Sequence, residues 1–431
     1  MLLNFENNIL DFSIDAPPSK SLYHRELIVR FLFGDTAHLE PLEDDSDDVL
    51  ATKACLKAML NARAGSKSGE VILPCNESGS TLRFMIPVAA AYLLGISPIP
   101  GLRLIFETQG RLYDRPIKEL ADALLQHGII IEKNDNSRTI EVYGRMTPGE
   151  YIIGGSVSSQ YISGLLMALS IFDEACSVIV MGEIKSIHYI ELTQEVLKKY
   201  GAPVRLSEIT YFPSVWDAEE AKALLGDLNT MDFSVEGDWS NGAFLLCLKE
   251  FTGISVGNLN PDSGQGDVMI LKFLESVNAA KAGLRAASED AENAPLTEES
   301  FWDCNDIPDI APYMAITSAF IFRKATFTGI ERLHIKESDR VKAVREQLTA
   351  IGIKTEETEN TLTVYGAPIA EIRKNTGATI RLSSYHDHRM AMCAILTGAA
   401  LKKNIELDDP DCLKKSFPQL LTIISDLAKT E

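Results

Sequence analysis

The stretch that decides the fold is PSKSLYHRELIVRFLFG, residues 18–34, in which a polar and charged start runs directly into an apolar segment. The same pattern returns five more times, at intervals of roughly 60 to 80 residues, longer than those of common solenoid repeats. The other copies are ESGSTLRFMIPVAAAYLLG (77–95), SVSSQYISGLLMALSIF (156–172), GDWSNGAFLLCLKEFTG (237–253), DIPDIAPYMAITSAFIF (306–322) and YHDHRMAMCAILTGAAL (385–401). Each copy is apolar on nearly every helical face, so the pattern predicts six buried helices.

Strand-like runs and more amphipathic helical segments, such as RPIKELADALLQHGIIIEKN (115–134), alternate between these copies. Because helices that are apolar all round must be buried, we expect helices in the cores and sheets outside them. The predicted fold class is therefore α/β, and two lobes of three buried helices are the simplest packing. A length of 431 residues also favours two domains over one.

The chain is acidic, with 61 acidic against 41 basic residues and a formal net charge of −20. Such a surface repels nucleic acid and anionic lipid, so neither is an expected partner. The seven cysteines are odd in number and widely spread, which disfavours disulfides and zinc sites. No apolar run approaches a membrane-spanning length, and residues 1–18 lack the features of a signal peptide. We therefore expect a cytoplasmic protein.

The starts of three copies carry more polar groups than helix capping needs. One Ser or Asp side chain caps a helix, whose first turn exposes unpaired N–H groups and a partial positive charge. The surplus groups are Lys20 and Arg25 in the first copy, Ser158, Ser159 and Gln160 in the third, and His386, His388 and Arg389 in the sixth. Desolvated charges are costly without a partner, and helix starts bind anions. If the starts converge on one cleft, that cleft should bind anions; otherwise they are only capped, buried helices.

Four more polar clusters stand next to apolar segments. They are QGRLYDRPIKEL (109–120) with Arg111 and Arg115, IPDIAPYM (307–314) with Asp309, IKESDRVKAV (335–344) with Lys336, Glu337, Asp339 and Arg340, and CLKKSFPQL (412–420) with Lys414 and Lys415. Taken singly these clusters are weak signals. ESDR is also typical of a capping box with surface ion pairs, and the two lysines are typical of a solvated pair.

Together, the motifs SKSxxxR, SGSTLR, RxxxRPI, SSQ, SxxYIxxT, IPD, IKESDR, DHRMAM and KKSFP resemble the 5-enolpyruvylshikimate-3-phosphate synthase family, the 3-phosphoshikimate 1-carboxyvinyltransferases. The resemblance runs from Pro18 to Pro418. It implies a monomer of two inside-out α/β domains, each of three βαβαββ units with buried helices and outer sheets. It also implies that the domains close on the small molecules 3-phosphoshikimate and phosphoenolpyruvate, with no metal or organic cofactor.

The resemblance also implies how the chain is divided. Residues 19–235 would form the lobe that binds 3-phosphoshikimate. Residues 1–18 and 236–431 would form the second lobe, which contributes phosphoenolpyruvate-binding and catalytic residues. The segment AEEAKALLGDLNTMD (218–232) is expected to be an insertion.

The family's site roles can be carried over to the matching positions of this sequence. For 3-phosphoshikimate the resemblance implies Lys20, Ser21, Arg25, Ser158, Ser159, Gln160, Ser186, Tyr189, Asp309 and Lys336. For phosphoenolpyruvate it implies Lys20, Gly79, Arg115, Gln160, Arg340, Arg389 and Lys415. The implied catalytic residues are Asp309, Glu337, Lys20 and His388, and no residue is expected to bind a metal.

The implied reaction is an addition followed by an elimination, through a tetrahedral intermediate, in the shikimate pathway of aromatic amino acid biosynthesis. The 5-hydroxyl of 3-phosphoshikimate attacks the central carbon of phosphoenolpyruvate while the methylene carbon is protonated, and loss of phosphate with a proton then restores the double bond. Two proton-transfer groups are needed. We expect Asp309 to be the base toward the hydroxyl and Glu337 the acid at the methylene, with Lys20 beside both. His388 would support Glu337 or the departing phosphate.

The charges of the implied residues fit these substrates. Two carboxylates and two phosphates bring a total of about −5 or −6 near neutral pH. Seven of the implied residues are basic: Lys20, Arg25, Arg115, Lys336, Arg340, Arg389 and Lys415. They would neutralise the substrates and leave the site slightly positive, and arginine suits planar, bidentate contacts with carboxylate and phosphate.

Two other readings remain open on the sequence alone. UDP-N-acetylglucosamine enolpyruvyl transferases share the fold and chemistry, but that family opens with Lys-Asn where this chain has Lys20-Ser21. It also usually carries a Cys in the loop before the matching arginine, where ETQGRLYDR (107–115) has none. A non-catalytic phosphometabolite-binding protein on the same fold is disfavoured by Asp309 and Glu337, because binding alone does not place carboxylates beside polyanions.

Overall fold

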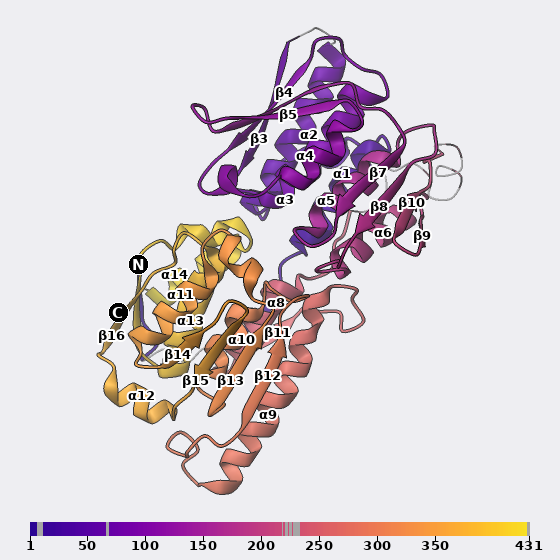
Figure 1. The fold of residues 1–431 in the computed structure, drawn as a ribbon. Coiled ribbons are helices and arrows are strands. Elements are labelled where there is room, and N and C mark those ends of the chain that lie inside the picture. The colour runs from indigo at the N-terminus through magenta and orange to yellow at the C-terminus, as the bar shows by residue number, and fades with distance from the viewer. Residues whose placement is uncertain are drawn as a thin grey trace. The chain divides into compact units, whose positions relative to one another are not determined.

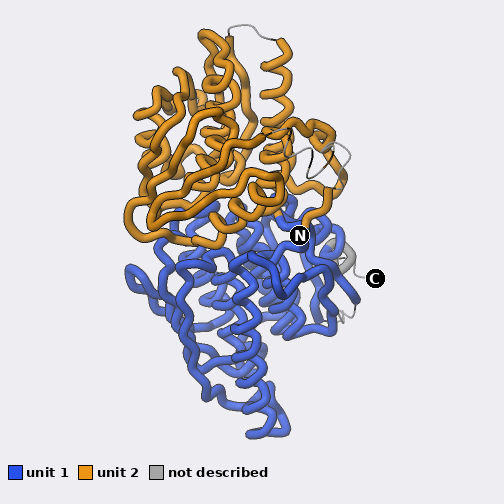
Figure 2. The backbone as a smooth tube through the Cα atoms, turned by 90° about the vertical axis from the view of Figure 1, so that its right-hand side faces the viewer, with its two compact units in different colours: residues 1–19, 236–431 blue, residues 20–235 orange. Residues whose placement is uncertain are grey.

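The computed structural model describes residues 1–6, 12–65, 69–217, 219, 223, 226 and 233–428. The predicted insertion at 218–232 lies almost wholly outside the described residues. The chain divides into two compact units, unit 1 with Met1–Ser19 and Glu236–Glu431, and unit 2 with Lys20–Val235 (Figures 1 and 2). Each unit has its own apolar core.

Unit 2 contains two successive βαβαββ units. The first comprises β3 (Glu70–Asn76), α3 (Gly79–Ala89), β4 (Arg103–Thr108), α4 (Lys118–Leu125), β5 (Ile129–Asn134) and β6 (Thr139–Gly144), with strand order β3-β4-β6-β5. The second comprises β7 (Glu150–Gly154), α5 (Ser159–Leu169), β8 (Ser177–Met181), α6 (His188–Lys199), β9 (Val204–Ser207) and β10 (Thr210–Pro213), with strand order β7-β8-β10-β9. In both sheets the first two strands are parallel and the remaining pairs are antiparallel. Helices α1 (Lys20–Leu32) and α2 (Asp47–Gly65) precede them.

Unit 1 contains one complete βαβαββ unit among the described residues and two shorter repeats. The complete unit comprises β12 (Glu299–Asp303), α10 (Ala311–Ser318), β13 (Lys324–Thr328), α11 (Arg340–Ala350), β14 (Lys354–Glu357) and β15 (Thr361–Tyr365). One shorter repeat comprises α12 (Ile369–Asn375), β16 (Thr379–Leu382), α13 (His388–Leu401), β17 (Asn404–Leu407) and α14 (Pro418–Ala428), with β1 (Leu2–Leu3) added to its sheet. The other comprises α8 (Trp239–Lys249), β11 (Ser255–Gly257) and α9 (Ile270–Ala287), with β2 (Ser13–Asp15) parallel to β11.

The six helices predicted to be buried are α1, α3, α5, α8, α10 and α13. Every residue of α10 and α13 is buried, and Gln160 alone in α5 is not. Each fully buried Leu, Ile or Phe side chain contributes about 1.5 to 3 kcal/mol, so helices that bury all their faces are the natural centre of a core. Strands such as β7 and β16 alternate between exposed and buried residues, as expected for sheets with one solvated face.

Four of these six helices begin with a side-chain cap. Ser78, Ser158, Asp238 and Asp387 accept hydrogen bonds from backbone N–H groups in the first turns of α3, α5, α8 and α13. The polar starts seen in the sequence therefore do serve as caps. Close packing also needs a glycine: a Cβ at Gly164 of α5 would lie 2.9 Å from the backbone oxygen of Arg83 in α3.

Candidate active site

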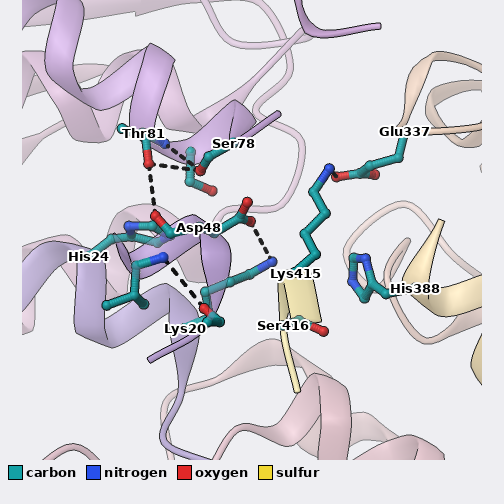
Figure 3. Close-up of polar contacts among 12 residues, drawn as sticks. Lys20, His24, Asp48, Ser78, Thr81, Glu337, His388, Lys415 and Ser416 are labelled. Carbon is teal, nitrogen blue, oxygen red and sulfur yellow. Dashed lines mark hydrogen bonds and ion pairs between the residues drawn. The ribbon is translucent and has the colours of Figure 1, made fainter. Parts of the chain in front are cut away.

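Lys20 is the first residue of α1, and its side chain points to the start of α2 in unit 2 (Figure 3). Its Nζ lies 2.8 Å from Oδ2 of Asp48, and Asp48 is almost fully buried. A charge-assisted hydrogen bond of this length fixes the ammonium at the helix start. Asp48 was not predicted as a site residue. Its only signal in the sequence is an acidic residue in a helix's first turn, which usually indicates helix stabilisation alone.

Arg25 lies one turn and a little more beyond Lys20 and is buried. Its guanidinium donates to the backbone oxygens of Ser21 and Tyr189 at 2.6 and 2.7 Å. It also donates to the hydroxyls of Thr193 and Ser163 at 2.7 and 3.3 Å. Burial disfavours the charged form and all four acceptors are neutral, so the pKa of Arg25 falls to about 10. An anionic ligand beside this guanidinium would offset the cost of burying its charge.

The predicted site residues Ser158, Ser159 and Gln160 lie at the start of α5, where Ser158 is the N-cap. The side-chain oxygen of Gln160 accepts from Nη1 of Arg83 at 2.8 Å, and its nitrogen donates to Oγ of Ser80 at 2.8 Å. Both partners belong to α3, so the start of α3 orients the Gln160 amide. Arg83 was quoted within a motif but was not selected as a site residue.

Gly79 is the first residue of α3 and touches Arg115, which follows the short helix η3 (Leu112–Asp114). A Cβ at Gly79 would lie 2.4 Å from Nη1 of Arg115. No side chain other than hydrogen fits this contact without moving the guanidinium. Gly79 and Arg115, which were predicted to contact the same ligand, are therefore neighbours.

Ser186 and Tyr189 lie at the start of α6. Ser186 is buried with a φ of 54°, a left-handed conformation that is uncommon outside glycine and is enriched at functional sites. Tyr189 provides the backbone oxygen that Arg25 contacts. Helix α6 contacts both α1 and α5, so the predicted 3-phosphoshikimate residues of unit 2 come from three neighbouring helix starts.

Arg340 is the centre of the unit 1 site. Its Nη1 lies 2.7 Å from Oδ1 of Asp309, its Nη2 lies 2.7 Å from Oε2 of Glu337, and its Nε lies 2.9 Å from Oδ2 of Asp387. Burial lowers the pKa of Arg340, but the three carboxylates outweigh burial and raise it above its ordinary value. The motif ESDR therefore forms a buried network around Arg340, while Asp339 caps α11.

Asp309 also faces two further bases. Lys336 Nζ and Arg389 Nε each lie 3.5 Å from its Oδ1. Burial favours the neutral acid, but the positive charges of Lys336, Arg389 and Arg340 hold the pKa of Asp309 well below its usual value. Burial lowers the pKa of Lys336 to about 8, although the charge of Asp309 opposes this shift. Asp309 is therefore ionised at neutral pH.

The two lysines of the KKSFP motif differ in their surroundings. The side chain of Lys415, the last residue of η7 (Asp411–Lys415), is 7% exposed, and its Nζ lies 3.8 Å from Oε1 of Glu337 (Figure 3). The side chain of Lys414 is 49% exposed and pairs with Asp411. Lys415, rather than Lys414, lies with the predicted site residues of unit 1.

The start of α13 supplies His388 and Arg389. His388 is buried, with its Nδ1 3.7 Å from Oδ1 of Asp387. Arg389 donates through Nη1 to the hydroxyl of Tyr313 at 3.1 Å. Burial lowers the pKa of Arg389, but Tyr313 and nearby carboxylates, Asp309 first among them, raise it well above its ordinary value. His386, two residues before His388, is exposed and pairs with Asp409.

The balance of charge differs from the count made on the sequence, because that count left out the acids. Asp48 neutralises Lys20, and Asp387 shares the charge of Arg340. Asp267 is a further buried acid in unit 1, whose pKa is raised to about 7 by burial and by the charge of Asp309. The seven bases therefore do not carry seven uncompensated charges. Ion pairs between residues distant in sequence leave no local pattern, so this error could not be found by reading motifs.

Over the described ranges, no group of three or more His, Cys, Asp or Glu side chains is arranged to hold a metal ion. Over the same ranges, no helix combines the length and apolar character needed to cross a membrane.

Buried helices with cationic starts, together with three carboxylates around the guanidinium of Arg340, are typical of an α/β enzyme that handles small anionic molecules. A family model described as EPSP synthase (3-phosphoshikimate 1-carboxyvinyltransferase) matches residues 7–424. The chain therefore belongs to the EPSP synthase family, as the motifs predicted.

Named relatives and solved structures agree with this family. The 3-phosphoshikimate 1-carboxyvinyltransferases of Clostridium beijerinckii and Clostridioides difficile are 29% and 28% identical to this chain, and each match covers 95% of this chain and 93% of the relative. EPSP synthase from Acinetobacter baumannii superposes with a TM-score of 0.66 at 18% identity, over 99% of this chain and 97% of that one. The enolpyruvyl transferase NikO from Streptomyces tendae gives 0.63 at 13% identity with the same coverage. The predicted inside-out α/β fold class is confirmed.

The protein is accordingly an enzyme, a transferase of the shikimate pathway of aromatic amino acid biosynthesis. It transfers the enolpyruvyl group of phosphoenolpyruvate to 3-phosphoshikimate. The predicted reaction is confirmed in this form.

Proposed function

We propose how the two units share this reaction. Unit 2 binds 3-phosphoshikimate through the starts of α1, α5 and α6, and unit 1 supplies phosphoenolpyruvate-binding and proton-transfer residues. The observation that carries the proposal is the pair of carboxylates, Asp309 and Glu337, each 2.7 Å from a different Nη nitrogen of Arg340. A planar guanidinium holds two carboxylates at a fixed separation. The reaction needs two proton transfers, and this arrangement provides two positioned groups.

Asp309 acts as the base toward the 5-hydroxyl of 3-phosphoshikimate, and Glu337 acts as the acid at the methylene carbon of phosphoenolpyruvate. Asp309 enters the reaction ionised, because three bases hold its pKa low. Anionic substrates that bind these bases would weaken their pull and raise the pKa of Asp309, making it a stronger base in the complex. Lys336 binds a shikimate hydroxyl, and His388 supports Glu337 or the departing phosphate.

The anionic groups of the substrates bind the cationic helix starts. Lys20, Ser21, Arg25, Ser158, Ser159, Gln160, Ser186 and Tyr189 contact 3-phosphoshikimate, together with Asp309 and Lys336. Lys20, Gly79, Arg115, Gln160, Arg340, Arg389 and Lys415 contact phosphoenolpyruvate. Arginines hold the carboxylate and phosphate groups in planar contacts, while positioning and fixed charge lower the barrier without a metal or organic cofactor.

The substrate is tested by measuring phosphate release from phosphoenolpyruvate with the purified enzyme and three acceptor conditions. We expect release with 3-phosphoshikimate, and none with UDP-N-acetylglucosamine or with no acceptor. Release with the sugar nucleotide alone would overturn the assignment. If phosphate is released with neither 3-phosphoshikimate nor UDP-N-acetylglucosamine, the result would favour a protein that only binds phosphometabolites. A chelator should leave the rate unchanged.

The proton-transfer roles are tested with Asp309→Asn and Glu337→Gln. Both variants should lower kcat by a factor of about 100 to 10,000, as removal of a general acid or base usually does. The matched control is Glu331→Gln, an exposed acid six residues before Glu337 in the short helix η6 (Glu331–Ile335). A control that loses as much kcat as Glu337→Gln, or an Asp309→Asn variant with normal kcat, would refute these roles.

We further propose that the enzyme acts in the cytoplasm as a monomer, as its resemblance to the EPSP synthase family implies. Sedimentation should give one species near 47.4 kDa. Specific activity should not change when the protein is diluted. Activity that falls on dilution would show that a second copy completes the site.

A further inference from the structure

Helices α1 and α2 share a second, uncharged contact below the Lys20–Asp48 ion pair. Lys20 and His24 are four residues apart on α1, and Asp48 and Thr52 are four residues apart on α2, so each pair lies on one helix face. Nδ1 of His24 lies 2.7 Å from Oγ1 of Thr52. The two helices are therefore joined by an ion pair at their starts (Figure 3) and by a neutral hydrogen bond one turn deeper.

The neutral contact continues to α3 through Thr81. Oγ1 of Thr52 lies 2.7 Å from Oγ1 of Thr81. The Thr81 hydroxyl in turn lies 3.2 Å from the backbone oxygen of Asp48 and 2.7 Å from Oγ of Ser78, the N-cap of α3. The His24 chain, defined as His24, Thr52 and Thr81, thus connects the starts of α1, α2 and α3, and all three residues are buried.

The hydrogen bonds beyond Thr52 favour one tautomer of His24. The Thr81 hydroxyl donates its one proton either to the backbone oxygen of Asp48, which can only accept, or to Oγ of Ser78. Thr81 must then accept from Thr52, because each hydroxyl has one proton to give. Thr52 must in turn accept from His24, so Nδ1 of His24 carries the proton. Every hydrogen bond of the chain runs from His24 toward the helix starts.

The surroundings of His24 agree with a neutral ring protonated at Nδ1. Its Nε2 is buried and has no hydrogen-bond partner among the described residues. A buried acceptor without a partner is tolerated better than a buried N–H without one. Burial lowers the pKa of His24 to about 3; Asp48 opposes this shift, and Lys20 and Arg25 reinforce it. A second proton on Nε2 would have no acceptor, so the ring stays neutral.

We propose that His24, as the neutral Nδ1–H tautomer, is a positioning residue for enolpyruvyl transfer. Through Thr52 and Thr81 it fixes the starts of three helices, and with them the ammonium of Lys20 and the Gly79 turn of α3. His24 touches no reacting atom. The proposal rests on the substrate-binding roles proposed above for Lys20 and Gly79.

The first experiment compares His24→Asn with His24→Gln. The amide nitrogen of Asn can occupy the place of Nδ1, whereas the Gln amide reaches the place of Nε2. We expect Asn to keep kcat/KM within about threefold of the wild type, and Gln to lower it by about 10- to 100-fold, the cost of small misplacements in a site. The control is His127→Asn, because the His127 ring stacks on Tyr151 and its Nε2 lies 2.9 Å from the backbone oxygen of Glu150. Equal losses for Asn and Gln would overturn the proposal.

The second experiment removes the middle of the chain and does not depend on the folding of His24 variants. Thr52→Val keeps the shape of the side chain but loses the hydroxyl, and it should lower kcat/KM by at least about tenfold. Thr52→Ser restores the hydroxyl and should recover most of that loss. Thr397→Val is the matched control, since among the described residues the Thr397 hydroxyl donates to the backbone oxygen of Cys393 within α13 and to no other group. A Thr52→Ser variant as impaired as Thr52→Val would refute a role for the hydrogen bond.

The third experiment reads the tautomer directly. Nitrogen-15 NMR of the ring, assigned by comparison with His24→Asn, should show a proton on Nδ1 and none on Nε2 from pH 5 to pH 9. A proton on Nε2, or titration within that range, would overturn the proposal. This measurement needs no activity. If the wild-type enzyme released no phosphate with 3-phosphoshikimate, the proposed roles would fail while the tautomer result would still stand.

Discussion

Arg25 in unit 2 and Arg340 in unit 1 are both buried guanidinium groups near helix starts, yet their partners differ. All four hydrogen bonds of Arg25 go to neutral oxygens, and its pKa is lowered to about 10. Arg340 contacts three carboxylates, and its pKa is raised. Burial disfavours the charge of both arginines. Only at Arg340 do carboxylates of the protein offset that cost.

The difference separates two uses of a buried arginine. Among the described residues, the acceptors of Arg25 are neutral oxygens, so its charge is available to an anionic substrate. Arg340 holds Asp309 and Glu337 in place, so its charge serves mainly to organise the proton-transfer groups. Removing each arginine should therefore damage the enzyme in a different way.

The largest effect is expected from Arg340→Met. Buried Asp387 and the partly buried Asp309 and Glu337 would each lose an ion-pair partner, which should lower the free energy of unfolding by about 3 to 5 kcal/mol and abolish turnover. Urea denaturation measures the first quantity. Arg345→Met on the same helix is the control: its side chain is 39% exposed and pairs with Glu357, so it should cost less than about 1 kcal/mol. If the free energies of unfolding of the two variants differ by less than about 1 kcal/mol, Arg340 does not hold its carboxylates in the way proposed.

Arg25→Met should spare stability and damage binding. The acceptors that Arg25 leaves behind can still pair with each other: the Thr193 hydroxyl lies 2.8 Å from Oγ of Ser163, which in turn donates to the backbone oxygen of Tyr189 at 3.2 Å. The free energy of unfolding should therefore fall by only about 1 to 2 kcal/mol. The KM for 3-phosphoshikimate should rise by about 10- to 100-fold, since a charged hydrogen bond to a ligand contributes about 1.5 to 3 kcal/mol. Stability lost to the same extent as in Arg340→Met would contradict the distinction.

Gly79→Ala should have a smaller effect that is confined to one substrate. The added Cβ would lie 2.4 Å from Nη1 of Arg115 and would push the guanidinium aside. We expect the KM for phosphoenolpyruvate to rise by about tenfold, the cost of misplacing one charged contact, with little change for 3-phosphoshikimate. Gly65→Ala in the same unit has no atom within 4 Å of the new Cβ and should behave as the wild type. Steady-state kinetics with each substrate varied in turn decides between these outcomes.

The smallest effect is a pH dependence that comes from Lys336. Burial lowers the pKa of Lys336 to about 8, although its side chain is 27% exposed. The ammonium is charged below that pH and neutral above it, so kcat/KM for 3-phosphoshikimate should fall as the pH rises through about 8. In Lys336→Arg the charge persists, and the alkaline fall should disappear or move to higher pH. An unchanged profile in that variant would assign the fall to another group.

The six buried helices could be read from the chain because the information is local: each segment is apolar on all sides and begins with polar residues. The bases of the site could also be found, since they stand inside ordered family motifs. Asp48 and Asp387 were not predicted as site residues, although Asp387 belongs to the motif DHRMAM. Each forms its ion pair with a residue 28 or 47 positions away, and nothing next to it in sequence indicates that partner.

The sequence by itself determined which segments are buried helices, which helix starts carry cations and which family the chain belongs to, because those properties depend on neighbouring residues. Only the tertiary structure decided which of the cations are neutralised. It joined Arg340 to three carboxylates and left Arg25 among neutral oxygens. The physical reason is that the cost of a buried charge depends on atoms within a few ångströms in space, and folding alone brings those atoms together.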